Sequence, residues 1–167
     1  MIIRQHQKGD AASEAIYSPD SRYRYSLTRT WAPGDKVLFV MLNPSTATEM
    51  QNDPTVERCE RRARALGFGG LAVANIFAFR ATDPRVMQAE PDPIGPLNDA
   101  TILDLATRCD RVICAWGSHG AHLDRGAQVL SLLRATRQDL FHLGLTLAGH
   151  PKHPLYIGYD KQPRPWS

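Results

Sequence analysis

Continuous apolar runs alternate with polar, helix-periodic segments along most of the chain. A strand covered on both faces of a sheet gives such a run, and four are present: Val37–Leu42, Leu71–Phe77, Arg111–Trp116 and Leu140–Leu143. The segments between them that read as helices are 53–66, 98–108 and 121–135. This order predicts an α/β fold, a three-layer sandwich around a central sheet of four mostly parallel strands.

The first helix has a well-defined beginning and end. Asp53 is a residue type that caps helices, Pro54 suits the first helical position, and the glycines from Gly67 onward stop the helix. The segment 37–77 is therefore strand, helix and strand, a crossover unit whose two strands are expected to be parallel.

Two regions flank this core. Residues 15–31 read as an antiparallel β-hairpin around a Pro-Asp-Ser turn. Residues 81–97 contain four prolines and are expected to form an ordered surface loop that could fold over a site. We expect a single domain over residues 1–167, with the α/β core at about 36–157 and a C-terminal tail at 158–167.

Composition narrows the class of protein. A chain with 43% hydrophobic and 22% charged residues is ordinary for a globular domain, which excludes a disordered or fibrous protein. The three cysteines lack C-x-x-C spacing, so neither a disulfide framework nor a thiolate zinc site is indicated. The N-terminus lacks the apolar stretch of a signal peptide, and no run approaches the ~18 residues of a membrane span. We expect a cytoplasmic protein with no membrane association.

The charge distribution leaves two interpretations open. A net charge of +3 permits an anionic partner without requiring one. The candidates for contacts with nucleic-acid phosphates are Arg58, Arg61, Arg62 and Lys152. Charge runs usually face water, however, and the arginines alternate with Glu57 and Glu60, so a solvated helix face is the other interpretation.

Ligands of open parallel sheets bind beyond the carboxyl ends of the strands. The residues at these ends are mostly polar: Asn43, Pro44 and Ser45 after the first run, Asn75 and Phe77 at the end of the second, Trp116, Gly117, Ser118 and His119 around the end of the third, and His150, Lys152 and His153 beyond the fourth. The sequence therefore predicts one polar site of nucleobase or nucleotide size.

Asn75 is the most informative of these residues. An amide inside the run Val-Ala-Asn-Ile-Phe is costly to bury unless its donor and acceptor are both used. It could meet the donor and acceptor edge of a nucleobase, or it could bond the backbone of a neighbouring loop. The sequence leaves both hypotheses for Asn75 open.

Two loops offer positions for water or phosphate. Asn43-Pro44-Ser45 provides short hydrogen-bonding groups on a stiff backbone, although a plain turn explains it as well. The glycines around Ser118 and His119 would let backbone amides approach an anion at the start of a helix. That segment lacks the full spacing of a known phosphate-binding motif.

The segment His150-Pro151-Lys152-His153-Pro154 is a stiff loop that could hold a donor against a developing negative charge. A zinc site built from His119 and His122 with one of the loop histidines is the competing interpretation. No carboxylate or cysteine completes a recognisable ligand set, so we expect no metal and no cofactor.

Six motifs together resemble one family. MLNPSTA, NDPTVERC, VANIFAFRATDP, PIGPLND, ICAWGSHG and GHPKHPLY occur in this order and resemble a bacterial and phage family known as domain of unknown function 1643. The resemblance covers nearly the whole chain. It implies no particular activity.

A more distant resemblance is to the uracil-DNA glycosylase superfamily, whose sheet of four parallel strands lies between helices. Met41-Leu42-Asn43-Pro44-Ser45 is similar to the motif that positions the hydrolytic water there, although Met41 replaces its glycine. Val73-Ala74-Asn75-Ile76-Phe77 is similar to the strand that ends in the base-recognising Asn, so the resemblance implies that Asn75 recognises the base. The segment from Val112 to Gly117 is similar to the apolar strand that ends in Trp-Gly there. The late histidine loop is similar too, but one extra residue leaves both His150 and His153 as candidates for the histidine that supports the departing base. No four-cysteine set is present, so the iron–sulfur cluster of some members is not expected.

These observations leave competing functions. The first is a glycosylase that acts on a flipped base in nucleic acid or a nucleotide, with Asn43 orienting water and His150 or His153 stabilising the leaving base. The second is a non-catalytic module that binds a base, nucleotide or nucleic-acid end in the same site. A structural or protein-interaction role is third.

Overall fold

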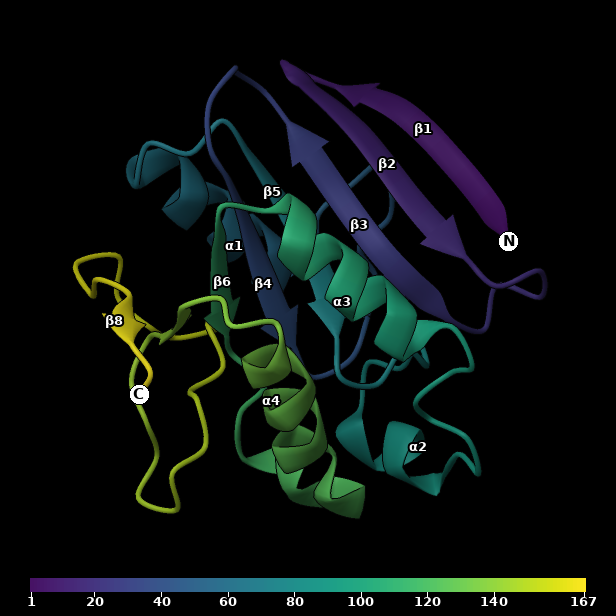
Figure 1. Ribbon diagram of the computed structural model, residues 1–167. Coiled ribbons are helices and arrows are strands. Elements are labelled where there is room, and N and C mark those ends of the chain that lie inside the picture. The colour runs from purple at the N-terminus through teal and green to yellow at the C-terminus, as the bar shows by residue number, and fades with distance from the viewer.

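The protein is built on one mixed sheet with helices against both faces (Figure 1). The computed structural model describes residues 1–167. The strand order is β1-β2-β3-β5-β4-β6-β7-β8. The strands are β1 (Ile2–Lys8), β2 (Ala11–Tyr17), β3 (Arg24–Thr30), β4 (Lys36–Met41), β5 (Gly70–Asn75), β6 (Arg111–Cys114), β7 (Leu140–His142) and β8 (Arg164–Pro165), and the helices are α1 (Pro54–Ala65), α2 (Pro84–Ala89), α3 (Asn98–Arg108), the 3-10 helix η1 (Ser118–Asp124) and α4 (Arg125–Ala135).

The predicted sheet of four mostly parallel strands is wrong. The sheet has eight strands, and four of its seven pairs are antiparallel. The four predicted strands are β4, β5, β6 and β7, which pair in parallel as neighbours in the middle of the larger sheet. Continuous apolar runs identify only strands covered on both faces, so the exposed β1 and β8 were missed, and β2 and β3 were predicted only as a separate hairpin.

The flanking regions also differ from expectation. The predicted hairpin at 15–31 is part of a three-stranded antiparallel unit, because β1 precedes it and β2 begins at Ala11. The interior positions of β1 are all exposed, so it has no apolar pattern to reveal it. β3 then pairs with β5, which joins this unit to the central sheet.

Three further segments hold short elements that were not predicted. The loop at 81–97 contains α2, capped by Asp83. The helix predicted at 121–135 is divided into η1 and α4 by non-helical backbone at His122 and Leu123. In the tail, β8 pairs with β7 as an edge strand.

The central strands are buried on both faces, and each face has its own core. In Figure 1 the helices α3 and α4 lie in front of the sheet and α1 lies behind it. Alternate side chains of β4 and β5 point to opposite faces, as the period of a strand requires. One core joins Val37, Phe39 and Val73 to Val56, Cys59 and Ala63 of α1, and the other joins Leu38, Val40 and Ala72 to Ile102, Leu105, Val129 and Leu133 of α3 and α4.

The beginning of α1 follows the sequence prediction. The Asp53 side chain accepts a hydrogen bond from the Val56 N–H at 2.9 Å, and Pro54 occupies the first turn. Gly67 has a φ of 86°, a left-handed value that favours glycine and ends the helix. None of the helices is long and apolar enough to span a membrane.

Candidate functional site

A cavity of about 540 Å³ opens at the carboxyl ends of β4 and β6, where the sequence predicted the site. Its size lies within the range usual for small-molecule sites. Predicted site residues in its wall are Asn43, Ser45, Trp116, Gly117, Ser118, His119 and His153. The other lining residues are Leu42, Asp53, Pro54, Thr55, Ala81, Thr82, Pro84, Leu155 and Tyr156. Loops distant in the sequence therefore meet around one polar space.

Two hydrogen bonds within the protein orient the side-chain amide of Asn43. Its amide nitrogen donates to the Ala81 carbonyl at 2.7 Å and to the Pro44 carbonyl at 3.1 Å. Pro44 is buried and accepts from the Ala81 N–H at 2.9 Å, while Ser45 bonds Thr82 at 3.2 Å. Since both amide hydrogens have partners, the free hydrogen-bonding capacity of Asn43 is its acceptor oxygen.

The structure separates the two candidate histidines. His153 lines the cavity, and the Leu155 N–H donates to its Nδ1 at 3.3 Å. When neutral, this ring carries its proton on Nε2 and is a hydrogen-bond donor there. His150 instead lines a separate cavity of about 240 Å³ beside Trp166. Of the two, only His153 shares the cavity with Asn43.

The turn after β6 brings the histidine loop to the site. Gly117 has a φ of 74°, and its N–H donates to the Pro151 carbonyl at 2.8 Å. A side-chain carbon at this position would lie 3.4 Å from His153 Cβ. Ser118 and His119 follow at the start of η1, which precedes α4, and anion binding at this turn stays a prediction. Trp116 forms a buried wall of the cavity.

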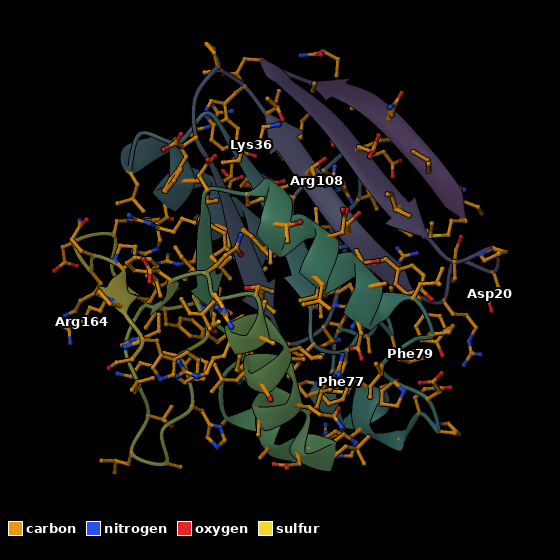
Figure 2. The ribbon with its side chains drawn as sticks, in the orientation of Figure 1. Asp20, Lys36, Phe77, Phe79, Arg108 and Arg164 are labelled. Carbon is orange, nitrogen blue, oxygen red and sulfur yellow. The ribbon has the colours of Figure 1, made fainter.

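Asn75 and Phe77 are not in the cavity wall. Phe77, labelled in Figure 2, is fully buried in the core that includes residues of α3 and α4. Its ring packs against His122, with the ring centroids 5.7 Å apart. Asn75 is 2% exposed, and its carbonyl accepts from the Asn98 side chain at 2.7 Å. The Asn75 side-chain amide has no hydrogen-bond partner within the chain, so neither of the two hypotheses for it is decided.

The candidate phosphate-binding arginines are mostly occupied within the protein. Arg58 and Arg62 both donate to the Ile157 carbonyl, and Arg62 also bonds the carbonyls of Gly158 and Lys161. Their guanidinium groups lie over the Tyr159 ring, at 4.7 and 5.5 Å from its centroid. These two arginines therefore fasten the C-terminal segment to α1.

Arg61 and Lys152 remain exposed, and Arg61 pairs with Glu57 at 3.0 Å. Arg58 is partly buried and Arg62 is buried, so neither a solvated face nor a phosphate-binding stripe describes all three candidate arginines. No group of three or more His, Cys, Asp or Glu side chains lies close enough together to hold a metal ion.

Nine cavity residues were not predicted as site residues, and Asp53 and Tyr156 are the two of them with ionisable side chains. Asp53 was recognised only as a helix cap, yet it lines the cavity. Tyr156 stands at the rim, 89% exposed and with a φ of 75° that is unusual for a residue other than glycine. The carboxylate at the end of a polar loop was the available signal for Asp53, whereas nothing local marks Tyr156.

Two buried arginines of β3 form hydrogen bonds to the loop 43–53 and so fix its position. Arg24 donates to the Ala47 carbonyl at 2.8 Å, and Arg29 donates to the Thr48 carbonyl at 2.8 Å and to the Asn52 side chain at 2.9 Å. Both arginines are almost inaccessible to solvent. Burial lowers the pKa of Arg24 to about 10, so this arginine still carries its charge at neutral pH. The antiparallel strands thus position the site loop.

Stability is expected to fall below neutral pH because of buried histidines. Burial lowers the pKa of His153, an effect that Asp53 opposes and His119 increases, and burial likewise lowers the pKa of His142. In the unfolded chain a histidine binds its proton near pH 6.5. The folded protein therefore loses stability as the pH falls from about 6.5 through the lower folded values, by at most about 1.4 kcal/mol per pH unit for each histidine.

Urea unfolding at pH 7.5 and 5.5 measures this effect. His153→Gln is expected to weaken the pH dependence, and the same substitution at the exposed His6 serves as control. An unchanged pH dependence in His153→Gln would mean that this ring is as free to protonate in the folded protein as in the unfolded one.

The comparison with protein families gives one match. The family model described as "Protein of unknown function (DUF1643)" matches residues 24–155, which is more than half of the chain and includes the whole of the cavity wall except Tyr156. The comparison with curated proteins finds no match. The chain therefore belongs to the DUF1643 family.

Proposed function

We propose that this protein is an N-glycosylase that hydrolyses the bond between the sugar and a modified or deaminated base. The observation that carries the proposal is the meeting of Asn43 and His153 in one cavity at the carboxyl ends of β4 and β6. A free acceptor oxygen and a ring N–H donor are the groups that such a hydrolysis needs on the two sides of the bond. The resemblance to the uracil-DNA glycosylase superfamily also implies a catalytic role for Asn43 and for one of the two late histidines, His150 or His153.

In the proposed reaction, the base enters the cavity after leaving its stack. Asn43 Oδ1 orients the attacking water, since its amide nitrogen is already bound to Ala81. The His153 Nε2–H donates to the base as negative charge develops on it. Trp116, buried in the cavity wall, offers an apolar surface to the base. Asn75 contacts the base edge only if the cavity extends to it in the complex.

A non-catalytic module that binds a base, nucleotide or nucleic-acid end is the second candidate. It is favoured by the hydrogen bonds that tie Asn43 and Ser45 to Ala81 and Thr82, because they make a rigid pocket without requiring any chemistry. A purely structural role would leave the polar cavity unexplained.

A panel of oligonucleotides and free nucleosides carrying uracil, hypoxanthine, xanthine and hypermodified pyrimidines tests the proposal. We expect release of one base by the wild type, and its loss in Asn43→Ala and His153→Gln. His150→Gln is the matched control, because His150 lies outside the cavity and the variant should remain active.

Melting temperatures of the variants separate loss of chemistry from loss of fold, since Asn43 also bonds Ala81. Binding of a ligand without any turnover would favour the binding module. Asn75→Ala measured on the same panel tests the base-edge hypothesis, which fails if binding is unchanged. Activity on nucleosides alone would remove nucleic acid as the partner.

A further inference from the structure

The cavity contains a carboxylate that the glycosylase proposal does not use. Asp53 is 8% exposed and lines the same space as Asn43 and His153. The proposed reaction lacks a group that can take the proton of the water, since the amide of Asn43 does not ionise near neutrality. A carboxylate can take that proton.

The protein fixes the orientation of the Asp53 carboxylate. One oxygen accepts from the Val56 N–H at 2.9 Å, and the other accepts from the Ala47 N–H at 3.2 Å. A carboxylate has about four acceptor positions, so these two bonds leave capacity for a water molecule. The second bond ties Asp53 to Ala47, in the same loop that carries Asn43.

The charge of Asp53 affects the pKa of His153. Both residues line the same cavity, and the charge of Asp53 raises the pKa of His153 against the larger effect of burial. Because burial has the larger effect, the pKa of His153 is lowered and the neutral ring with its Nε2–H is favoured. A carboxylate and a ring N–H donor that line one cavity can act on the water and on the leaving base, respectively.

Resting on the proposed glycosylase function, we propose that Asp53 is the general base that activates the water. The water oxygen attacks the anomeric carbon while its proton passes to Asp53. The bond from that carbon to the base nitrogen breaks, and its electron pair leaves with the base, which the His153 Nε2–H stabilises. The proton on Asp53 is later transferred to the departing base, so the enzyme returns to its starting state.

A structural role is the alternative that the test must exclude. Asp53 caps α1, and its charge also raises the pKa of the buried Arg24 against burial. Asn and Ser cap helices about as well as Asp does, so both substitutions retain the cap while removing the carboxylate. Ser also leaves room for a small carboxylate from solution.

The experiment compares wild type, Asp53→Asn and Asp53→Ser in single-turnover base release, with melting temperature measured for each. Loss of a general base is expected to slow release by about 10²–10⁴-fold. Added formate is expected to restore part of the rate in Asp53→Ser and to leave the wild type unchanged. Because a structural defect would not respond to formate, the rescue distinguishes the two roles even if the variants are less stable.

The outcomes keep the two proposals apart. If the wild type releases a base and Asp53→Asn does so within about 5-fold of its rate, Asp53 is not the base and the glycosylase proposal stands. A slow Asp53→Ser variant without formate rescue also overturns the assignment. If the wild type releases no base from any member of the panel, the glycosylase proposal itself fails and the role of Asp53 fails with it.

Discussion

Replacing Arg29 by methionine is expected to lower the free energy of unfolding by several kcal/mol, at about 1–3 kcal/mol for each buried acceptor left without a partner. Arg29 is completely buried in β3. It bonds Ser13 on β2, and its other guanidinium nitrogen reaches the carbonyls of Thr48 and Gln51 and the side chain of Asn52. Methionine fills similar space but leaves these acceptors without partners.

Denaturant unfolding measures the loss, and hydrogen exchange of the 43–53 loop shows where it arises. The matched control is Arg61→Met on α1, whose side chain is 67% exposed. A surface pair of this kind contributes about 0–1 kcal/mol. If Arg29→Met cost no more than this control, the site loop would not depend on β3 for its position.

Gly120→Ala is expected to destabilise the protein by about 1–3 kcal/mol, because it overfills a packed site. A side-chain carbon at Gly120 would lie 2.3 Å from Trp116 Cδ1 and 3.0 Å from its Nε1. Gly126 and Trp166 also lie against the ring, so it can be displaced only toward one of the two cavities that it lines. Because Trp116 forms a wall of the main cavity, the substitution should also change the shape of the site.

Near-ultraviolet circular dichroism reports the displacement of the Trp116 ring, and denaturant unfolding gives the loss of stability. Ala121→Ser, at the next and exposed position, is the control and should change stability by no more than about 0.5 kcal/mol. A stable Gly120→Ala variant with an unchanged spectrum would show that η1 shifts easily and that the close packing against Trp116 is not required.

Arg29→Met and Gly120→Ala test two different parts of the structure that position the site. Arg29 acts from the antiparallel strands, below the loop that carries Asn43 and Asp53. Gly120 acts from η1, behind the Trp116 wall. Combined with the catalytic variants, they separate residues that would perform the chemistry from those that hold them in place.

The histidine loop illustrates how far local sequence signals extend. The prolines and histidines of the segment from His150 to Pro154 indicated a stiff functional loop, but not which histidine faces the site. That depends on Gly117, whose left-handed backbone and bond to Pro151 turn His153 toward the cavity. Such a contact joins residues far apart in the chain, and no local pattern encodes it.

The amino-acid sequence by itself determined the elements whose signals are local. The α/β class, the central strands and the beginning of α1 at Asp53 follow from apolar runs, helix periodicity and capping chemistry within a few residues. It also determined that the polar residues collect at the carboxyl ends of β4 and β6, because parallel strands end at the same edge of a sheet.

Only the tertiary structure decided the rest. It extended the sheet to eight strands, since the exposed β1 and the short β8 are stabilised by pairing with a neighbour and not by an apolar pattern of their own. In the folded protein, Arg58 and Arg62 hydrogen-bond to the C-terminal segment. Phe77 is buried in the core, and Asp53 lines the cavity. In each case the physical reason is the same: the partner that gives the residue its role lies in a distant part of the chain and becomes its neighbour only when the chain folds.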